Sequence, residues 1–249
     1  MRRSRLQTLR VRLDQLVVDK GLAPSRERAR ALILAGQVSV DGQPQTKAGT
    51  AVDCAADVAL IAADHPYVGR GGVKLAHALD TFNIAVDGRE ALDIGASTGG
   101  FTDVLLKRGA TRVVALDVGH GQIDWTLRNE PRVLVIEHFN ARHLQLSDLP
   151  GPVDIVTIDV SFISLRQIFP VVPPLLRADA DVIALVKPQF EAGRSEIRKG
   201  VIRDAGVQSR VLEEVSAAAR EVGLIPVTST PSPITGAKGN VEFLLHLRP

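Results

Sequence analysis

The sequence has 249 residues, of which 45% are hydrophobic and 23% are charged, and its formal net charge is +2. This composition is typical of a globular protein and excludes a disordered chain. The single cysteine, Cys54, excludes a disulfide framework, and no apolar run reaches the roughly 18 residues that predict a membrane span. We therefore expect a cytoplasmic protein of one large domain or two ordinary ones.

Positive charge is concentrated at the start of the chain. Residues 1–50 contain ten arginines and lysines but four aspartates and glutamates, a net charge of +6. Because the whole chain has a net charge of +2, the remaining residues have a net charge of −4. This distribution indicates a polyanionic partner, although a solvated, charged helix face explains the charge alone equally well.

The first region predicts two short helices followed by small strands. An apolar stripe predicts a helix within residues 12–22, and a second helix is expected within residues 24–36, with Ser25 as its N-cap. Alternating residues and an Asp-Gly turn indicate a hairpin at 37–43, and residues 57–64 predict another strand.

Residues 12–43, RLDQLVVDKGLAPSRERARALILAGQVSVDGQ, resemble the S4 RNA-binding domain across nearly its whole length. The resemblance implies that basic residues of the second helix and the adjoining turns contact the phosphates and sugars of structured RNA. Arg26 and Arg30 share one helix face, whereas Arg28 points elsewhere and is expected to be a surface charge. The implied RNA-binding residues are Arg12, Ser25, Arg26 and Arg30.

The second region alternates short Val/Ile/Leu runs with helix patterns, which is typical of a parallel sheet covered on both faces. The sequence therefore predicts a Rossmann-like, doubly wound α/β domain with a mostly parallel sheet at residues 65–249, after a small α+β S4-like domain at 1–64. The expected strands lie within 90–95, 112–119, 132–137, 154–162, 181–188, 224–230 and 241–247, and the expected helices within 102–109, 122–129, 165–172 and 208–223.

A glycine-rich turn joins the first of these strands to its following helix. The spacing of Gly95, Gly99 and Gly100 is G-x-x-x-G-G, which differs from the G-x-G-x-x-G of dinucleotide-binding proteins. Asp93 precedes the turn, where a carboxylate repels pyrophosphate and favours a cationic aminoacyl group. Asp117 ends the next strand, where an acid accepts both hydroxyls of a ribose unless it caps a helix instead.

These features together resemble the class I S-adenosylmethionine site. Asn140, after the third strand, lies where such enzymes contact the adenine. The resemblance implies S-adenosylmethionine as the cofactor, held by Asp93, Gly95, Ala96, Ser97, Gly99, Gly100, Asp117, Val118, Asn140 and Asp159.

Ionisable residues also mark the ends of later strands. Asp159 ends one strand and Lys187 ends the next, and the carboxyl ends of neighbouring parallel strands converge on one crevice, so we expect these side chains to meet. The positions of Lys74, early in the region, and Glu242, at the last strand, do not follow from periodicity.

Longer motifs resemble the TlyA family, also called haemolysin A, over almost the entire chain: GRGGVKL, DIGASTGGFT, DVGHGQ, DVSFISL, LVKPQFE and GNVEF. The second region also resembles FtsJ-type 2′-O-methyltransferases, whose catalytic Lys-Asp-Lys-Glu tetrad falls on Lys74, Asp159, Lys187 and Glu242. The resemblance implies methyl transfer to the ribose 2′-hydroxyl of a cytidine in ribosomal RNA. It leaves open the target nucleotide, the ribosomal subunit and the oligomeric state.

The ribose hydroxyl must lose a proton as it attacks the methyl group. Lys187, beside the second cation Lys74, is expected to have a depressed pKa and to act as a base or to orient the hydroxyl, while Asp159 and Glu242 position the lysines. Family members often carry tyrosine where His120 stands and threonine where Phe139 stands, and both positions flank the expected cofactor pocket.

Other function classes compete with this interpretation. A non-catalytic RNA-binding or assembly factor would keep the fold, a membrane-lytic haemolysin needs an apolar amphipathic stretch that the sequence lacks, and a dehydrogenase needs the other glycine spacing. Methylation of pyrimidine C5 usually requires a cysteine, and Cys54 lies in the first region. We expect no metal site, because the six histidines show no ligand spacing.

Overall fold

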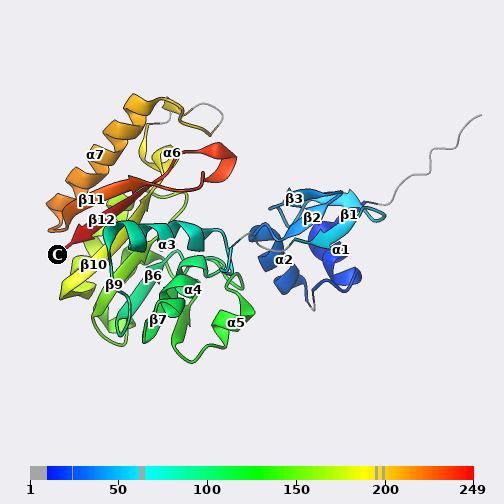
Figure 1. Cartoon of the computed structure of the whole chain (residues 1–249), viewed down its shortest axis with the longest axis horizontal. Helices are drawn as coiled ribbons and strands as arrows, with labels where there is room; N and C mark the ends of the chain where they lie inside the picture. Colours follow the sequence, from blue (N-terminus) through cyan, green and yellow to red (C-terminus); the bar gives the residue numbers. More distant parts are fainter. Residues whose placement is uncertain (1–9, 24, 62–64, 194–195, 198–199) are drawn as a thin grey trace, which may run out of the picture.

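The computed structural model describes residues 10–23, 25–61, 65–193, 196–197 and 200–249. They form a small α+β unit and a larger α/β unit that lie side by side (Figure 1). The basic residues within 1–9 and the expected domain boundary at residue 64 lie outside the described residues. Among the described helices, none has the length and apolar character that crossing a bilayer would require.

The small unit packs two helices against short antiparallel strands. Leu16 and Val17 share one core with Ile33 of the second helix, as the apolar spacing predicts. Ser25 Oγ accepts the backbone N–H of Arg28 at 3.2 Å, which confirms the predicted N-cap. Two sheets form, in the orders β1-β4 and β3-β2-β5. The elements are β1 (Arg10–Arg12), α1 (Leu13–Asp19), α2 (Arg26–Leu34), β2 (Val38–Val40), β3 (Gln43–Gln45), β4 (Ala51–Asp53) and β5 (Val58–Leu60).

A seven-stranded sheet in the order β11-β12-β10-β9-β6-β7-β8 forms the centre of the large unit. β6 to β10 pair in parallel, and β12 runs antiparallel to β10 and β11, so the prediction of a mostly parallel sheet is confirmed. The elements are α3 (Gly71–Phe82), β6 (Glu90–Ile94), α4 (Gly100–Lys107), β7 (Arg112–Leu116), α5 (Trp125–Arg128), β8 (Val133–Ile136), β9 (Val153–Ile158), β10 (Leu176–Val186), α6 (Pro188–Glu191), α7 (Ala205–Glu221), β11 (Ile225–Pro231) and β12 (Phe243–Arg248).

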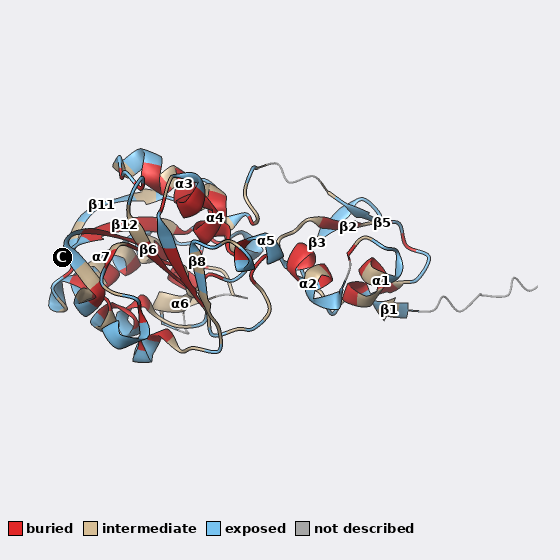
Figure 2. Ribbon diagram, turned by 90° about the horizontal axis from the view of Figure 1, so that it is seen from below, coloured by how far each residue is buried: buried red, intermediate tan, exposed pale blue. Residues whose placement is uncertain are grey.

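Both faces of this sheet are buried, which explains why its strands read as continuous apolar runs. Ala91 and Ile155 contribute to a core with α3 and α4 on one face. Leu92 and Val156, the next residues along the same strands, contribute to a core with α7 on the other face. Figure 2 shows the buried strands between these covering helices.

The α-helix predicted within residues 165–172 is wrong. The chain there forms three short 3₁₀ turns, η3 (Leu165–Gln167), η4 (Phe169–Val171) and η5 (Pro173–Leu175). Pro170, Pro173 and Pro174 lack the N–H group that an α-helical ladder needs, so only short turns form. The residues still bury Phe169 and Leu175 completely, and they cover the sheet as a helix would.

The two units touch where α2 meets the loop before α5. Arg28 of α2 forms an ion pair with Asp124, the N-cap of α5. Gly121 lies against Glu27 of α2, since a Cβ on this glycine would be 2.5 Å from Glu27 Oε1. The expectation that Arg28 is only a surface charge is therefore wrong, since its side chain connects the two units.

Candidate active site and RNA-binding surface

Asp159 and Lys187 meet at the carboxyl edge of the sheet, as their places at neighbouring strand ends predict. Asp159 follows β9, and Lys187 follows β10 directly before α6. Lys187 Nζ lies 2.6 Å from Asp159 Oδ1 in an ion pair that lacks the alignment of a hydrogen bond. The same ammonium donates a hydrogen bond to Ser161 Oγ at 2.9 Å. Two contacts therefore hold the largely buried lysine in place.

Lys74 and Glu242 form a second pair beside the first. Lys74 Nζ donates to Glu242 Oε2 at 2.5 Å, and both side chains are largely buried. α3 begins against Asp159, because a Cβ on Gly71 would lie 4.0 Å from Asp159 Oδ2. Lys74 lies about one turn further along α3. The structure thus gathers the four residues in one region, and each lysine has a carboxylate partner.

A cavity of about 400 Å³ opens next to this cluster. A smaller cavity of about 110 Å³ adjoins it, and both are lined by Gly95, Ser97 and Asp159. Of the other expected cofactor residues, Asp117, Val118 and Asn140 line the larger cavity, and Ala96 and Gly100 line the smaller one. The two cavities together therefore include most of the expected cofactor residues.

Asp117 is fixed at the rim of the larger cavity by the backbone. Its Oδ2 accepts the N–H of Ser97 at 2.8 Å, and its Oδ1 accepts the N–H of Gly119 at 2.6 Å. The alternative that Asp117 caps a helix is wrong, because Asp124 caps α5. Each carboxylate oxygen keeps a further lone pair for a ligand hydroxyl.

Gly99 and Gly100 are required for close packing against other parts of the protein. Gly99 has a φ of +92°, and a Cβ there would lie 2.2 Å from Leu127. A Cβ on Gly100 would lie 2.9 Å from the backbone nitrogen of Gly72. Gly100 thus lets α4 begin directly against the start of α3, which carries Lys74, and Gly99 makes room for Leu127 of α5. Gly99 is absent from the walls of both described cavities.

Asp93 is fully buried beneath the glycine turn and lines neither of the two cavities described above. Its carboxylate accepts hydrogen bonds from Thr102 Oγ1 at 2.7 Å and from Thr157 Oγ1 at 2.9 Å. Burial raises the pKa of Asp93 to about 7, against the opposing effect of these hydrogen bonds. Asp93 is therefore not placed to attract a cationic ligand by direct contact, although the sequence led us to expect this. Asp93 ties β6 to β9 and α4.

The expected RNA-binding arginines surround one buried carboxylate in the small unit. Arg12, Arg26 and Arg30 all contact Asp14, which is 0% exposed. Ser25 is exposed at the start of the same helix α2, where it forms the N-cap. The three guanidiniums lie on one face of the unit, whereas Arg28 lies at the contact with α5.

Comparisons with known proteins match two parts of the chain to two different families. Residues 67–249 match the FtsJ-like methyltransferase family, and residues 11–58 match the S4 domain. The Mycobacterium tuberculosis 16S/23S rRNA (cytidine-2′-O)-methyltransferase TlyA is 48% identical over 241 residues, which cover 96% of this chain and 90% of that protein. This chain belongs to the TlyA family.

Other members of the family carry different names. Hemolysin A from Brachyspira hyodysenteriae is 41% identical over 95% of this chain and 99% of its own length. A solved structure from Streptococcus thermophilus, also named as a hemolysin, is 42% identical with a TM-score of 0.76, over 96% of this chain and 88% of that one. The methyltransferase family match shows that the dehydrogenase alternative is wrong.

His120 and Phe139 stand at the two positions where the resemblance to the TlyA family leads us to expect other residues. Phe139 lines the larger cavity, where it adds an apolar ring to the wall. His120 stacks on His138 with ring centroids 4.6 Å apart, and its Nδ1 lies 3.2 Å from Glu137 Oε2. Both side chains are therefore accommodated by their surroundings.

Phe162 is a candidate site residue that sequence reasoning missed. It is 90% exposed at the rim of the larger cavity, and its φ of +64° is a strained conformation for a non-glycine residue. Its ring lies 5.0 Å from that of Phe190, whose centroid is 6.0 Å from Lys187 Nζ. The one available signal in the sequence is a large apolar residue directly after a strand that ends in a candidate catalytic acid.

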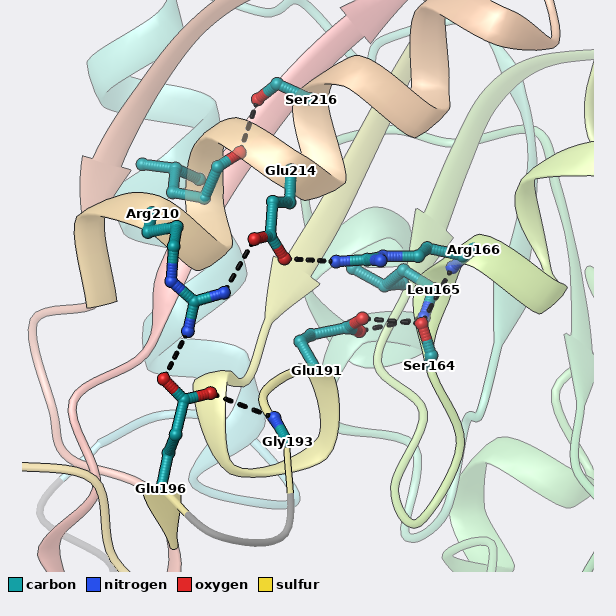
Figure 3. A network of polar contacts seen from close by, with 10 residues as sticks. Ser164, Leu165, Arg166, Glu191, Gly193, Glu196, Arg210, Glu214 and Ser216 are labelled. Atoms are coloured by element: carbon teal, nitrogen blue, oxygen red, sulfur yellow. Dashed lines mark hydrogen bonds and ion pairs between the residues drawn. The ribbon is translucent and has the colours of Figure 1, made fainter. Parts of the chain in front are cut away.

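The loop that carries Asp159 and Phe162 is fastened to α6 by Glu191 (Figure 3). Glu191 accepts Ser164 Oγ at 2.5 Å and the N–H of Leu165 at 2.8 Å. Burial raises the pKa of Glu191, although these hydrogen bonds oppose the shift. The contact joins the two loops that bear Asp159 and Lys187. The network continues toward α7 through Arg166, Glu214, Arg210 and Glu196.

Proposed function

We propose that this protein transfers a methyl group from S-adenosylmethionine to the 2′-hydroxyl of a cytidine in ribosomal RNA, and that residues 1–64 and 65–249 form its RNA-binding and catalytic domains. The observation that carries the proposal is the two lysine–carboxylate contacts, one of which involves Asp159, a residue that lines both cavities. The M. tuberculosis relative, named as a 16S/23S rRNA (cytidine-2′-O)-methyltransferase, supports the substrate class.

The residues present fit S-adenosylmethionine. A cavity of about 400 Å³ is within the range of small-molecule sites, and its apolar wall includes Phe139 and Ile168. Asp117 would accept the ribose hydroxyls, and Asn140 would contact the adenine. The smaller cavity, at Gly95, Ala96 and Ser97, would receive the amino-acid end of the cofactor. Asp159 lines both cavities and therefore stands at their junction.

When bound, the cofactor supplies a methyl group on a positively charged sulfur. Lys187 would orient the ribose hydroxyl and, once its ammonium has lost a proton, its neutral amine would take up the hydroxyl proton as the oxygen attacks. Asp159 and Ser161 fix the position of the lysine nitrogen through the contacts described above. Lys74, held by Glu242, adds positive charge beside the developing negative oxygen. Alignment of the reacting atoms contributes much of the acceleration.

The surroundings of the cluster suit RNA. Phe162 presents an exposed ring beside Phe190, which borders Lys187, and the base of the target cytidine can stack there. Arg12, Arg26 and Arg30 on the small unit supply contacts to the RNA backbone away from the reaction site. The contact of Arg28 with Asp124 holds the RNA-binding helix at a defined place relative to the catalytic unit.

The decisive experiment is transfer of a labelled methyl group to unmodified small and large ribosomal subunits, followed by nuclease digestion and mass spectrometry. We expect 2′-O-methylcytidine, and the subunit that gains it is the substrate. Lys187→Ala should abolish transfer while RNA binding persists, and Lys107→Ala on the outer part of α4 is the matched lysine control. Absence of transfer by protein that binds the cofactor would contradict the proposal and favour a non-catalytic RNA-binding role.

A further inference from the structure

Asp14 is surrounded by arginines that come from two separate elements. Arg12, at the end of β1, donates from Nε and Nη2 to the two oxygens of Asp14, each at 2.9 Å. Arg26 Nη2 and Arg30 Nε of α2 both donate to Asp14 Oδ2 at 3.1 Å. One carboxylate with no solvent exposure thus receives four N–H groups.

The arginines remain accessible although the acid is buried. Their side chains are 46–53% exposed, so the parts of the guanidiniums that do not touch Asp14 face solvent. Three positive charges around one negative charge leave a net charge of +2 at this spot. The hydrogen bonds from Arg12, followed by those from Arg30 and Arg26, lower the pKa of Asp14 and outweigh the opposing effect of burial. The acid therefore stays ionised at neutral pH.

Fixed guanidiniums suit a phosphate better than free ones. An arginine side chain loses much conformational freedom when it binds a ligand, and this loss is smaller when the guanidinium is already held. A guanidinium that uses one edge on Asp14 keeps other N–H groups for phosphate oxygens. The net charge of +2 on this cluster favours the negatively charged phosphates of the RNA backbone. The edges of bases present both donors and acceptors, and guanidiniums offer donors alone.

We propose that Asp14 is the positioning residue of a phosphate-binding site in which Arg12, Arg26 and Arg30 grip the backbone of ribosomal RNA. The proposal rests on the proposed function only in taking ribosomal RNA as the ligand. A buried acid within an RNA-binding surface would thereby increase the affinity for a polyanion. Its negative charge alone would repel the polyanion and lower the affinity. That difference in sign makes the idea testable.

The test compares two variants of the full chain that each remove one negative charge from α1. Asp14→Asn removes the buried acid. Asp19→Asn removes an exposed acid that contacts Gln15 alone among the described side chains. Binding to protein-free 23S and 16S ribosomal RNA is measured by filter retention over a range of potassium chloride concentrations. No cofactor is added, so methyl transfer plays no part.

We expect Asp14→Asn to weaken binding about 10-fold at moderate salt, and to reduce the slope of log affinity against log salt by about 1 because one phosphate contact is lost. Asp19→Asn should bind as tightly as the unchanged protein or slightly tighter. If Asp14→Asn binds as tightly as Asp19→Asn, with the small unit folded, the proposal is wrong.

A folding defect is separated from a positioning defect by a second variant. Arg12→Lys keeps the positive charge but cannot contact both oxygens of Asp14 at once. Hydrogen exchange of α1 and α2 amides shows whether each variant is folded. A folded Arg12→Lys that binds RNA several-fold more weakly supports the proposal, and one that binds as the unchanged protein does contradicts it. Failure of methyl transfer with normal RNA binding would contradict the proposed function alone.

Discussion

Gly236 lies directly against the carboxylate of Glu242: a Cβ on Gly236 would be 1.8 Å from Glu242 Oε1. The φ of Gly236 is −76°, so the backbone itself would accept any residue. The missing side chain therefore serves the position of Glu242, which in turn holds Lys74. We predict that Gly236→Ala displaces Glu242 and lowers kcat about 100-fold, since a displacement of about 1 Å in a catalytic group has effects of this size.

The matched control for this change is Gly151→Ala. Gly151 has no described atom within 4 Å of its Cβ position, so an added methyl group meets no neighbour. Steady-state methyl transfer should be unchanged in Gly151→Ala, and the dissociation constant for S-adenosylmethionine should be unchanged in both variants. Full activity of Gly236→Ala would show that the Lys74–Glu242 contact is not needed for the reaction.

Phe162 provides a second prediction. Stacking of a base on an aromatic ring contributes about 1–3 kcal/mol, so Phe162→Ala should lower kcat/KM for RNA by roughly 5- to 150-fold. Phe162→Tyr keeps the ring and should retain most of the activity. The measurement is methyl transfer at varied RNA concentration. An effect confined to the dissociation constant of the cofactor would instead assign Phe162 to the cavity wall.

The sequence predicts the part of the site that depends on strand ends. Asp117, Asp159 and Lys187 directly follow β7, β9 and β10, and parallel strands bring these positions to one edge. Lys74 and Glu242 could not be predicted in this way. One lies on a helix and the other precedes an antiparallel strand 168 residues later, so their contact depends on packing that local pattern does not encode.

Sequence patterns also fail to show which atoms a residue faces. Asp93 and Gly99 occupy motif positions that favour a ligand, but the structure turns both toward protein atoms. Helix periodicity separates Arg28 from Arg26 and Arg30, yet it cannot reveal that Arg28 meets Asp124, 96 residues away. The proline-rich segment from η3 to η5 shows a third limit of sequence patterns. Its apolar spacing correctly predicted that the segment is buried against the sheet, but wrongly predicted an α-helix where 3₁₀ turns form.

The Arg28–Asp124 contact yields a third prediction. Asp124 also caps α5 by accepting Thr126 N at 2.9 Å, so the clean change is at Arg28. Arg28→Ala should loosen the small unit from the catalytic unit and lower kcat/KM about 10-fold, the effect expected for loss of about 1.4 kcal/mol from a charged hydrogen bond. RNA affinity measured by filter retention should change little. A loss of affinity equal to that of Arg26→Ala would identify Arg28 as an RNA contact.

Asp93 yields a prediction about pH and stability. Its folded-state pKa of about 7 lies above the value of about 3.9 expected in the unfolded chain. Between about pH 4 and pH 7 the folded state therefore binds a proton that the unfolded state has released. The contribution of Asp93 to stability therefore falls as pH rises through this window and then becomes level, by up to about 4 kcal/mol for three pKa units.

Asp93→Asn should remove this pH dependence, because an amide cannot titrate and can still accept a hydrogen bond from Thr102 or Thr157. Urea unfolding at pH 5 and pH 8, followed by circular dichroism, measures the free energy of unfolding of both proteins. The advantage of the unchanged protein over the variant should be larger at pH 5 than at pH 8. Asp14 and Asp181 have lowered pKa values that place their effect at more acidic pH, and Glu191, whose pKa is raised, titrates in both proteins and cancels in the difference. Equal differences at the two pH values would show that Asp93 is already ionised at pH 5 and that hydrogen bonds, not burial, dominate at this position.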